Sequence, residues 1–83
     1  MAREITARQL ELLVMLANGS DIDEIAKAKY LSYYTVRNNL HLARNRAGAR
    51  SLTHLVVLAL ATGLLSFSSD GIAQIVDNTA VSK

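Results

Sequence analysis

The sequence predicts an all-α domain built from four helices, and three observations support this fold class. Apolar residues recur every three or four positions along residues 7–17, 22–29 and 32–47, which is the period of one helix face. A Ser, Thr or Asp residue that can cap a helix stands at the start of each of these stretches. A fourth stretch, residues 52–62, is apolar around nearly its whole circumference.

The composition limits the chain to one small domain. Its 83 residues lie near the lower limit at which a single hydrophobic core is sufficient. The absence of cysteine excludes disulfides and thiolate metal sites, and His41 and His54 alone are too few for an ordinary zinc centre. The start of the chain lacks the apolar run of a signal peptide. We therefore expect a cytoplasmic protein with no metal and no cofactor.

One uncharged stretch, residues 51–69, is long enough to raise the question of a membrane span. Its densely apolar part, residues 55–65, has only 11 residues, whereas a helix needs about 20 to cross a bilayer. The sequence therefore predicts a buried helix and no membrane contact.

Two capping boxes mark the first two helices. Thr6 and Gln9 have the spacing in which a cap side chain and the third helical residue bond to each other's backbone groups, and Asp21 and Glu24 repeat it. We expect the first helix to end at residues 18–19, where a glycine follows an asparagine, and the second to end near residue 29.

The third helix, residues 32–47, carries the strongest functional signal. Ser32 can cap its start and Gly48 can end it. Only Tyr30 and Leu31 separate it from the second helix, and two helices joined by so short a turn form a helix-turn-helix. Its inward face is apolar and consists of Val36, Leu40, Ala43 and Ala47. Its outward face contains no acidic residue and consists of Tyr33, Tyr34, Arg37, Asn38, His41, Arg44 and Asn45.

Charge is distributed unevenly along the chain. The net charge is −3 over residues 1–26, +6 over residues 27–54 and −1 over the remainder. A basic block without acids that is centred on a helix favours binding to a polyanion, although a solvated helix face would have the same charge.

The outward face of the third helix contains the residue types that pair with base edges in the major groove. Arg37 suits guanine and Asn38 suits adenine, and His41 lies one turn further along the same surface. We expect these three residues to read DNA bases. The simpler interpretation is a solvated surface, and His41 in particular could cover the helix flank without touching a base.

Two further groups of residues are candidates for contacts with the DNA backbone. Hydroxyl groups at the start of a helix can bind a phosphate, and cations on either side of the groove can reach other phosphates. The first group consists of Ser32, Tyr33, Tyr34 and Thr35, and the second of Lys27, Arg44, Arg46 and Arg50. Capping, a protein interface or surface solubility would also account for individual members.

The fourth helix is too apolar for an exposed helix of a small monomer. Leu52, Leu55, Val56 and Ala59 can face the core, which leaves a second apolar side without polar cover. This second side consists of Val57, Ala61 and Leu64, with Leu58 at its edge. We expect these residues to form the interface of a symmetric homodimer.

The helices end near residue 65, so we divide the chain into a domain over residues 1–65 and a tail over residues 66–83. Ile72, Ile75 and Val76 have helical spacing, which predicts a short helix within this tail.

From residue 5 to residue 65 the chain resembles, without gaps, the LuxR/GerE-type helix-turn-helix family. The shared residues are Ile5, Thr6, Arg8, Glu11, Leu13, Leu16, Ala17, Gly19, Glu24, Ile25, Ala26, Leu31, Ser32, Thr35, Val36, Arg37, Asn38, Leu40, Gly48, Ser51, Thr53, Gly63, Leu64 and Leu65. The resemblance implies a tetrahelical DNA-binding domain, dimerisation through the fourth helix, and control of transcription in a bacterium or a bacterial virus.

The chain departs from the family pattern at three positions. Lys29 stands where the family has an apolar residue closing the second helix, so the corner is expected to be looser. His54 replaces the acid that would complete a capping box with Ser51, and Asn39 stands where the family often has His. We expect no receiver or ligand-sensing domain before the helices, as in the stand-alone members of the family.

These observations support two functional hypotheses. The first is a homodimeric regulator of transcription that binds double-stranded DNA in a sequence-specific manner. The second is a protein-interaction module on the same fold that binds RNA polymerase or another regulator. Catalysis is not expected, because the acids lie in the first two helices and the tail, far along the chain from the Ser-Thr-His group at residues 51–54.

Overall fold

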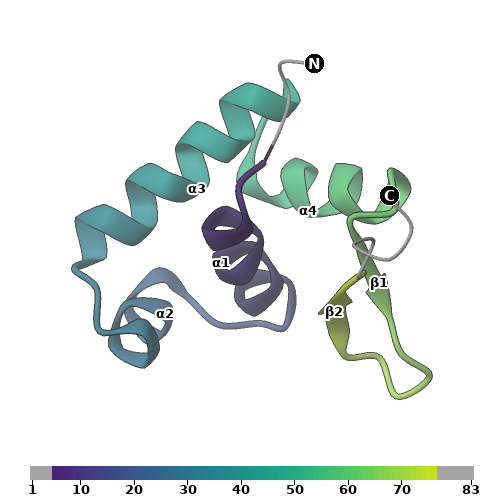
Figure 1. Cartoon of the computed structure of the whole chain (residues 1–83), viewed down its shortest axis with the longest axis horizontal. Helices are drawn as coiled ribbons and strands as arrows, with labels where there is room; N and C mark the ends of the chain where they lie inside the picture. The colour runs from purple at the N-terminus through teal and green to yellow at the C-terminus, as the bar shows by residue number, and fades with distance from the viewer. Residues whose placement is uncertain (1–4, 77–83) are drawn as a thin grey trace.

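A computed structural model describes residues 5–76 of the chain. The described elements are α1 (Ala7–Ala17), α2 (Ile22–Lys29), α3 (Tyr33–Ala47), α4 (Leu52–Ala61), β1 (Leu65–Phe67) and β2 (Ala73–Ile75). Helix α1 lies at the centre, with α2 and α3 on one side and α4 and the β1–β2 hairpin on the other (Figure 1). The tetrahelical helix-turn-helix fold predicted from the sequence is confirmed.

Both predicted capping boxes are present. In α1 the Gln9 amide N–H donates to the Thr6 hydroxyl at 3.0 Å, and the Thr6 amide donates to the Gln9 side chain at 3.1 Å. In α2 the corresponding distances between Asp21 and Glu24 are 2.9 and 2.8 Å. These bonds satisfy backbone donors that a helix start otherwise leaves unpaired. The capping residues therefore determine where the first two helices begin.

The recognition helix predicted over residues 32–47 is also present. Ser32 is its cap and accepts a hydrogen bond from the Thr35 amide at 3.0 Å. Gly48 ends it with φ of 73°, in the left-handed region that glycine adopts at little cost. Both ends of α3 are thus held by local geometry, which gives its side chains a defined direction.

The turn between α2 and α3 contains an unusual backbone conformation. Tyr30 ends α2 with φ of 57° and ψ of 42°, a left-handed conformation that costs a non-glycine residue free energy. Leu31 packs against the core beneath the turn. Lys29, where a looser corner was expected, instead forms an ion pair with Glu11 of α1 at 3.7 Å.

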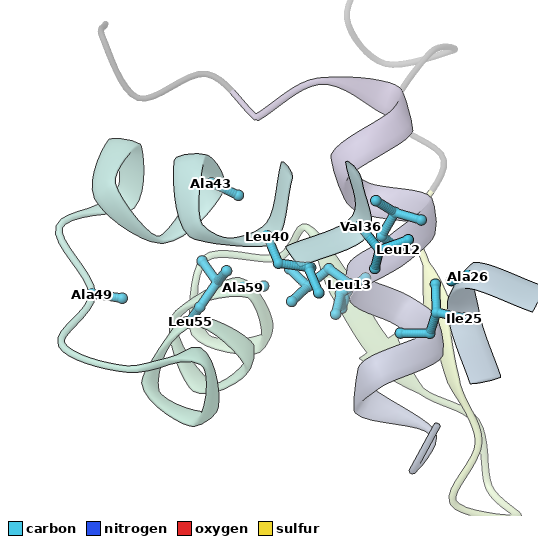
Figure 2. Packing of buried hydrophobic residues seen from close by; sticks show 11 residues of the cluster. Leu12, Leu13, Ile25, Ala26, Val36, Leu40, Ala43, Ala49, Leu55 and Ala59 are labelled. Carbon is cyan, nitrogen blue, oxygen red and sulfur yellow. The ribbon is translucent and has the colours of Figure 1, made fainter. Parts of the chain in front are cut away.

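The core is formed by one apolar cluster that joins all four helices. Figure 2 shows Leu12 and Val36 pointing toward each other between α1 and α3, with Ile25 of α2 beside them. Leu13 and Leu40 connect this part to the region between α3 and α4. Each of these five side chains is fully buried, so the cluster fixes α3 against the rest of the domain.

At the start of α4, His54 takes part in capping despite its departure from the family pattern. The His54 amide donates to the Ser51 hydroxyl at 3.0 Å, and the His54 ring atom Nδ1 accepts a hydrogen bond from the Arg50 amide at 3.0 Å. A histidine therefore satisfies a backbone donor at this helix start, one residue earlier than the acid of a capping box would.

The short helix predicted around residues 72–76 is wrong, because this segment forms strand β2. The strands β1 and β2 are antiparallel, and Leu65, Ser66 and Phe67 pair with Ile75, Gln74 and Ala73. The isoleucines fit helical spacing, but the chain turns back at residues 68–71 and pairs with residues 65–67. Residues 77–83 of the predicted tail lie outside the described residues.

Asn18, the residue that ends α1, fastens the hairpin to the helices. Its side-chain amide donates to the Ala73 carbonyl at 3.0 Å and accepts from the Ala73 amide at 2.7 Å. Beyond the two ends of the strands, the Ser68 amide donates to the Ile72 carbonyl and the Val76 amide donates to the Leu64 carbonyl. Hydrogen-bonded and non-hydrogen-bonded pairs alternate along an antiparallel ladder, so the N–H and C=O groups of Ala73 point away from β1. Asn18 therefore occupies the place of a neighbouring strand, and the folded unit extends beyond residue 65.

A membrane span is not found in this part of the chain. Among residues 5–76, no helix combines the length and the hydropathy needed to cross a bilayer.

Candidate nucleic-acid interface

Two candidate base-reading residues lie exposed on α3. Arg37 and Asn38 are exposed in the first half of the helix, Arg37 beside the buried stripe of Val36 and Leu40 and Asn38 opposite it. Within residues 5–76 neither of their side chains has a hydrogen-bonding or ion-pair partner. Their polar groups therefore keep their full capacity to bind a ligand, while the helix that carries them is fixed by the core.

The third candidate, His41, is not free. It is half-buried, and its Nδ1 atom accepts a hydrogen bond from the Nε–H of Arg44 at 3.3 Å. The guanidinium of Arg44 also donates from Nη1 to the Ala49 carbonyl at 3.4 Å. His41 and Arg44, which were assigned to base reading and to the DNA backbone, are therefore brought together in one network.

The candidate phosphate-binding hydroxyls are grouped at the start of α3. The Ser32 hydroxyl donates to the Thr35 hydroxyl at 2.9 Å while it caps the helix. Tyr33 and Tyr34 pack edge to face with ring centroids 5.7 Å apart, and Tyr34 is 69% exposed. The helix start therefore presents an aromatic surface next to its unpaired amide groups.

The remaining candidate cations are contributed by α2, by α3 and by the loop before α4. Lys27 is exposed in the last turn of α2, Arg46 in the last turn of α3, and Arg50 in the loop before α4. Residues 25–69 contain no acidic residue. The segment that holds α3 and its flanking turns is therefore basic.

The candidate dimer residues divide into two sets. Val57 is 52% exposed and Ala61 is also exposed on α4, and Leu58 is half-buried beside them. Leu64 lies beyond the end of α4, because Gly63 has φ of 86° and turns the chain away from the helix. Leu64 is half-buried and packs against the core, so the placement of Leu64 on the outward stripe of the helix is corrected.

No candidate metal centre occurs in the described part of the chain, since no group of three or more His, Cys, Asp or Glu residues among residues 5–76 could hold a metal ion.

The chain matches no family model, but it is similar to known proteins in sequence and in fold. Over 65 residues it is 31% identical to the Bacillus subtilis protein YxjL, an uncharacterized transcriptional regulatory protein, covering 78% of this chain and 30% of YxjL.

A solved structure of the Vibrio cholerae VqmA dimer, described among LuxR-type receptors and determined in the absence of target DNA, is similar in fold. The TM-score is 0.69 at 26% identity, and the match covers 89% of this chain and 35% of VqmA. The chain therefore has the fold of a LuxR-type helix-turn-helix domain and resembles one in sequence. It spans about a third of the length of each of these two proteins.

Within this LuxR-type domain, the sequence identified the exposed candidates on α3 but missed the network that connects them. The carbonyl of Ala49 is a backbone atom in a loop, and no side-chain pattern indicates that Arg44 binds it. The spacing of His41 and Arg44, which are three residues apart on a helix, was the one signal that could have predicted their contact.

Proposed function

We propose that this LuxR-type domain is a transcriptional regulator that binds double-stranded DNA in a sequence-specific manner as a homodimer. Helix α3 would enter the major groove, with Arg37 and Asn38 reading base edges. The observation that carries the proposal is that these two side chains are exposed and uncommitted on a helix fixed at both ends. The basic segment that holds α3 supports it, because phosphate contacts supply much of the affinity for DNA.

The proposed homodimer rests on the outward side of α4. Val57 and Ala61 are exposed there without polar cover, and a copy related by a two-fold axis would bury both. Two α3 helices would then face successive major grooves, so the preferred DNA site would be an imperfect inverted repeat.

Selection of bound sequences from a pool of random duplexes tests the function. We expect an enriched inverted repeat whose affinity falls steeply as the salt concentration rises, because phosphate contacts release counterions. Recovery of a pool with no preferred sequence would contradict sequence-specific binding.

A second candidate function is an interaction module that binds RNA polymerase or another regulator. It is favoured by one observation, the three exposed tyrosines at the helix-turn-helix corner, since Tyr30 is 94% and Tyr34 69% exposed and Tyr33 lies beside them. Aromatic residues are enriched in protein interfaces. Weak binding to duplex DNA, together with tight binding to a partner protein that changes little with salt, would favour this function over the first.

A further inference from the structure

The hydrogen bond between His41 and Arg44 determines the tautomer of the histidine ring and the number of donors that Arg44 has left. A ring nitrogen accepts a hydrogen bond only when it carries no proton, so Nδ1 of His41 is unprotonated and the proton of the neutral ring lies on Nε2. Arg44 uses its Nε–H for His41 and one Nη1–H for Ala49. Since a guanidinium has five N–H donors, three remain for another acceptor.

The two bonds hold Arg44 across the junction between α3 and α4. His41 lies one turn before Arg44 on the same helix, while Ala49 belongs to the loop that follows the helix. An arginine loses rotamer freedom when it binds a ligand, and a side chain that is already ordered loses less. The network therefore reduces the entropic cost of an Arg44 contact with an anion.

Arg44 differs in this respect from Arg37, two turns earlier on α3. Arg37 has no side-chain partner within residues 5–76, whereas Arg44 is half-buried and bonded at two positions. A fixed cation suits a phosphate, whose position depends little on sequence, whereas a free arginine can adapt to a base edge.

We propose that His41 is a positioning residue that orders Arg44 for a contact with a DNA phosphate, and that it does not read a base. The inference rests on the proposed DNA binding and deepens it by assigning separate roles along α3. Arg37 and Asn38 read the sequence, and the His41–Arg44 pair anchors the helix to the backbone of the duplex.

Two variants of His41 separate the two possible roles. In His41→Asn the amide oxygen occupies approximately the position of Nδ1 and can still accept from Arg44, whereas in His41→Gln the amide occupies approximately the position of Nε2. We expect His41→Asn to bind the selected duplex within about twofold of the wild type. We expect His41→Gln and His41→Ala to bind about fivefold more weakly, because the entropic cost of ordering the Arg44 side chain then falls on DNA binding.

The experiment measures dissociation constants for the selected duplex and a random duplex of equal length over a range of salt concentrations. The loss in His41→Ala should be the same for both duplexes, because a phosphate contact carries no sequence information. In the Arg44→Ala background, His41→Ala should cause no further loss, since the two residues act as one unit.

Three outcomes would overturn the positioning role. The first is a loss of affinity in His41→Ala that is confined to the selected duplex, with a relaxed preference at one base pair. The second is an equal loss of affinity in His41→Asn and His41→Ala. The third is a full additional loss of affinity when His41→Ala is introduced into the Arg44→Ala background. Nitrogen NMR of the wild-type chain gives a check without DNA, and a proton on Nδ1 of neutral His41 would also overturn it. A wild-type chain that binds neither duplex would instead contradict the proposed function, so the two failures are distinguishable.

Discussion

At the scale of single residues, the two arginines of α3 should respond differently to substitution. Replacing Arg37 with Ala should weaken binding to the preferred duplex by about 1–3 kcal/mol and relax the preference at one base pair, because a bidentate arginine–base contact is lost. Replacing Arg44 with Ala should weaken all duplexes alike and reduce the salt dependence. Binding titrations on selected and random duplexes measure both effects, and identical behaviour of the two variants would contradict the division of roles.

Tyr30 offers a second test at this scale, because its left-handed backbone costs stability. The conformation costs an L-residue roughly 1–2 kcal/mol, and glycine avoids this cost but loses more entropy on folding. We expect Tyr30→Gly to raise the free energy of unfolding by about 0.5–1 kcal/mol in urea denaturation. The matched control is Ala28→Gly at an exposed position of α2, which should lower it by about 1 kcal/mol. A lower stability of Tyr30→Gly would show that the Tyr30 side chain makes compensating contacts.

At the scale of elements, the attachment of the hairpin depends on Asn18. Asn18→Ala removes two hydrogen bonds to Ala73 and leaves the N–H and C=O groups of Ala73 without their partner. We expect a loss of about 1–3 kcal/mol in the free energy of unfolding and faster hydrogen exchange at the Ala73 amide. Gln74→Ala, an exposed position in the same strand, is the control and should change neither quantity. Unchanged exchange at Ala73 in Asn18→Ala would contradict this role for the side chain.

The same elements show how far the sequence predicts the fold. Caps such as Thr6 with Gln9 act over three residues, so the sequence alone places the start of a helix correctly. The hairpin depends on the bond between Asn18 and Ala73, which are 55 residues apart, and no local period contains that information. The helical spacing of Ile72 and Ile75 was therefore interpreted as a helix.

The candidate site follows the same division between local and distant information. The period of α3 correctly placed Arg37 and Asn38 on its exposed face. It could not show that the Ala49 carbonyl binds Arg44, because that contact depends on the path of the loop. Leu64 was placed on the outward stripe because the helical period of α4 was continued past Gly63. The helix ends before Gly63, where a positive φ turns the chain in another direction.

At the scale of the whole molecule, the proposed dimer should control the affinity for DNA. Ala61 is exposed on α4 and outside the buried cluster, so Ala61→Glu should leave the fold intact while placing two like charges in the seam between copies. Two recognition helices about 34 Å apart require the dimer, so this variant should lose far more affinity for an inverted repeat than for a half-site. Sedimentation velocity measures the oligomeric state, and circular dichroism checks that the helices remain. Ala28→Glu, the same substitution at an exposed position of α2, should leave the dimer intact, and any loss of affinity from its added charge should be equal for the inverted repeat and the half-site. A wild-type chain that is monomeric at micromolar concentration, or an Ala61→Glu chain that still dimerises, would contradict an interface on this side of α4.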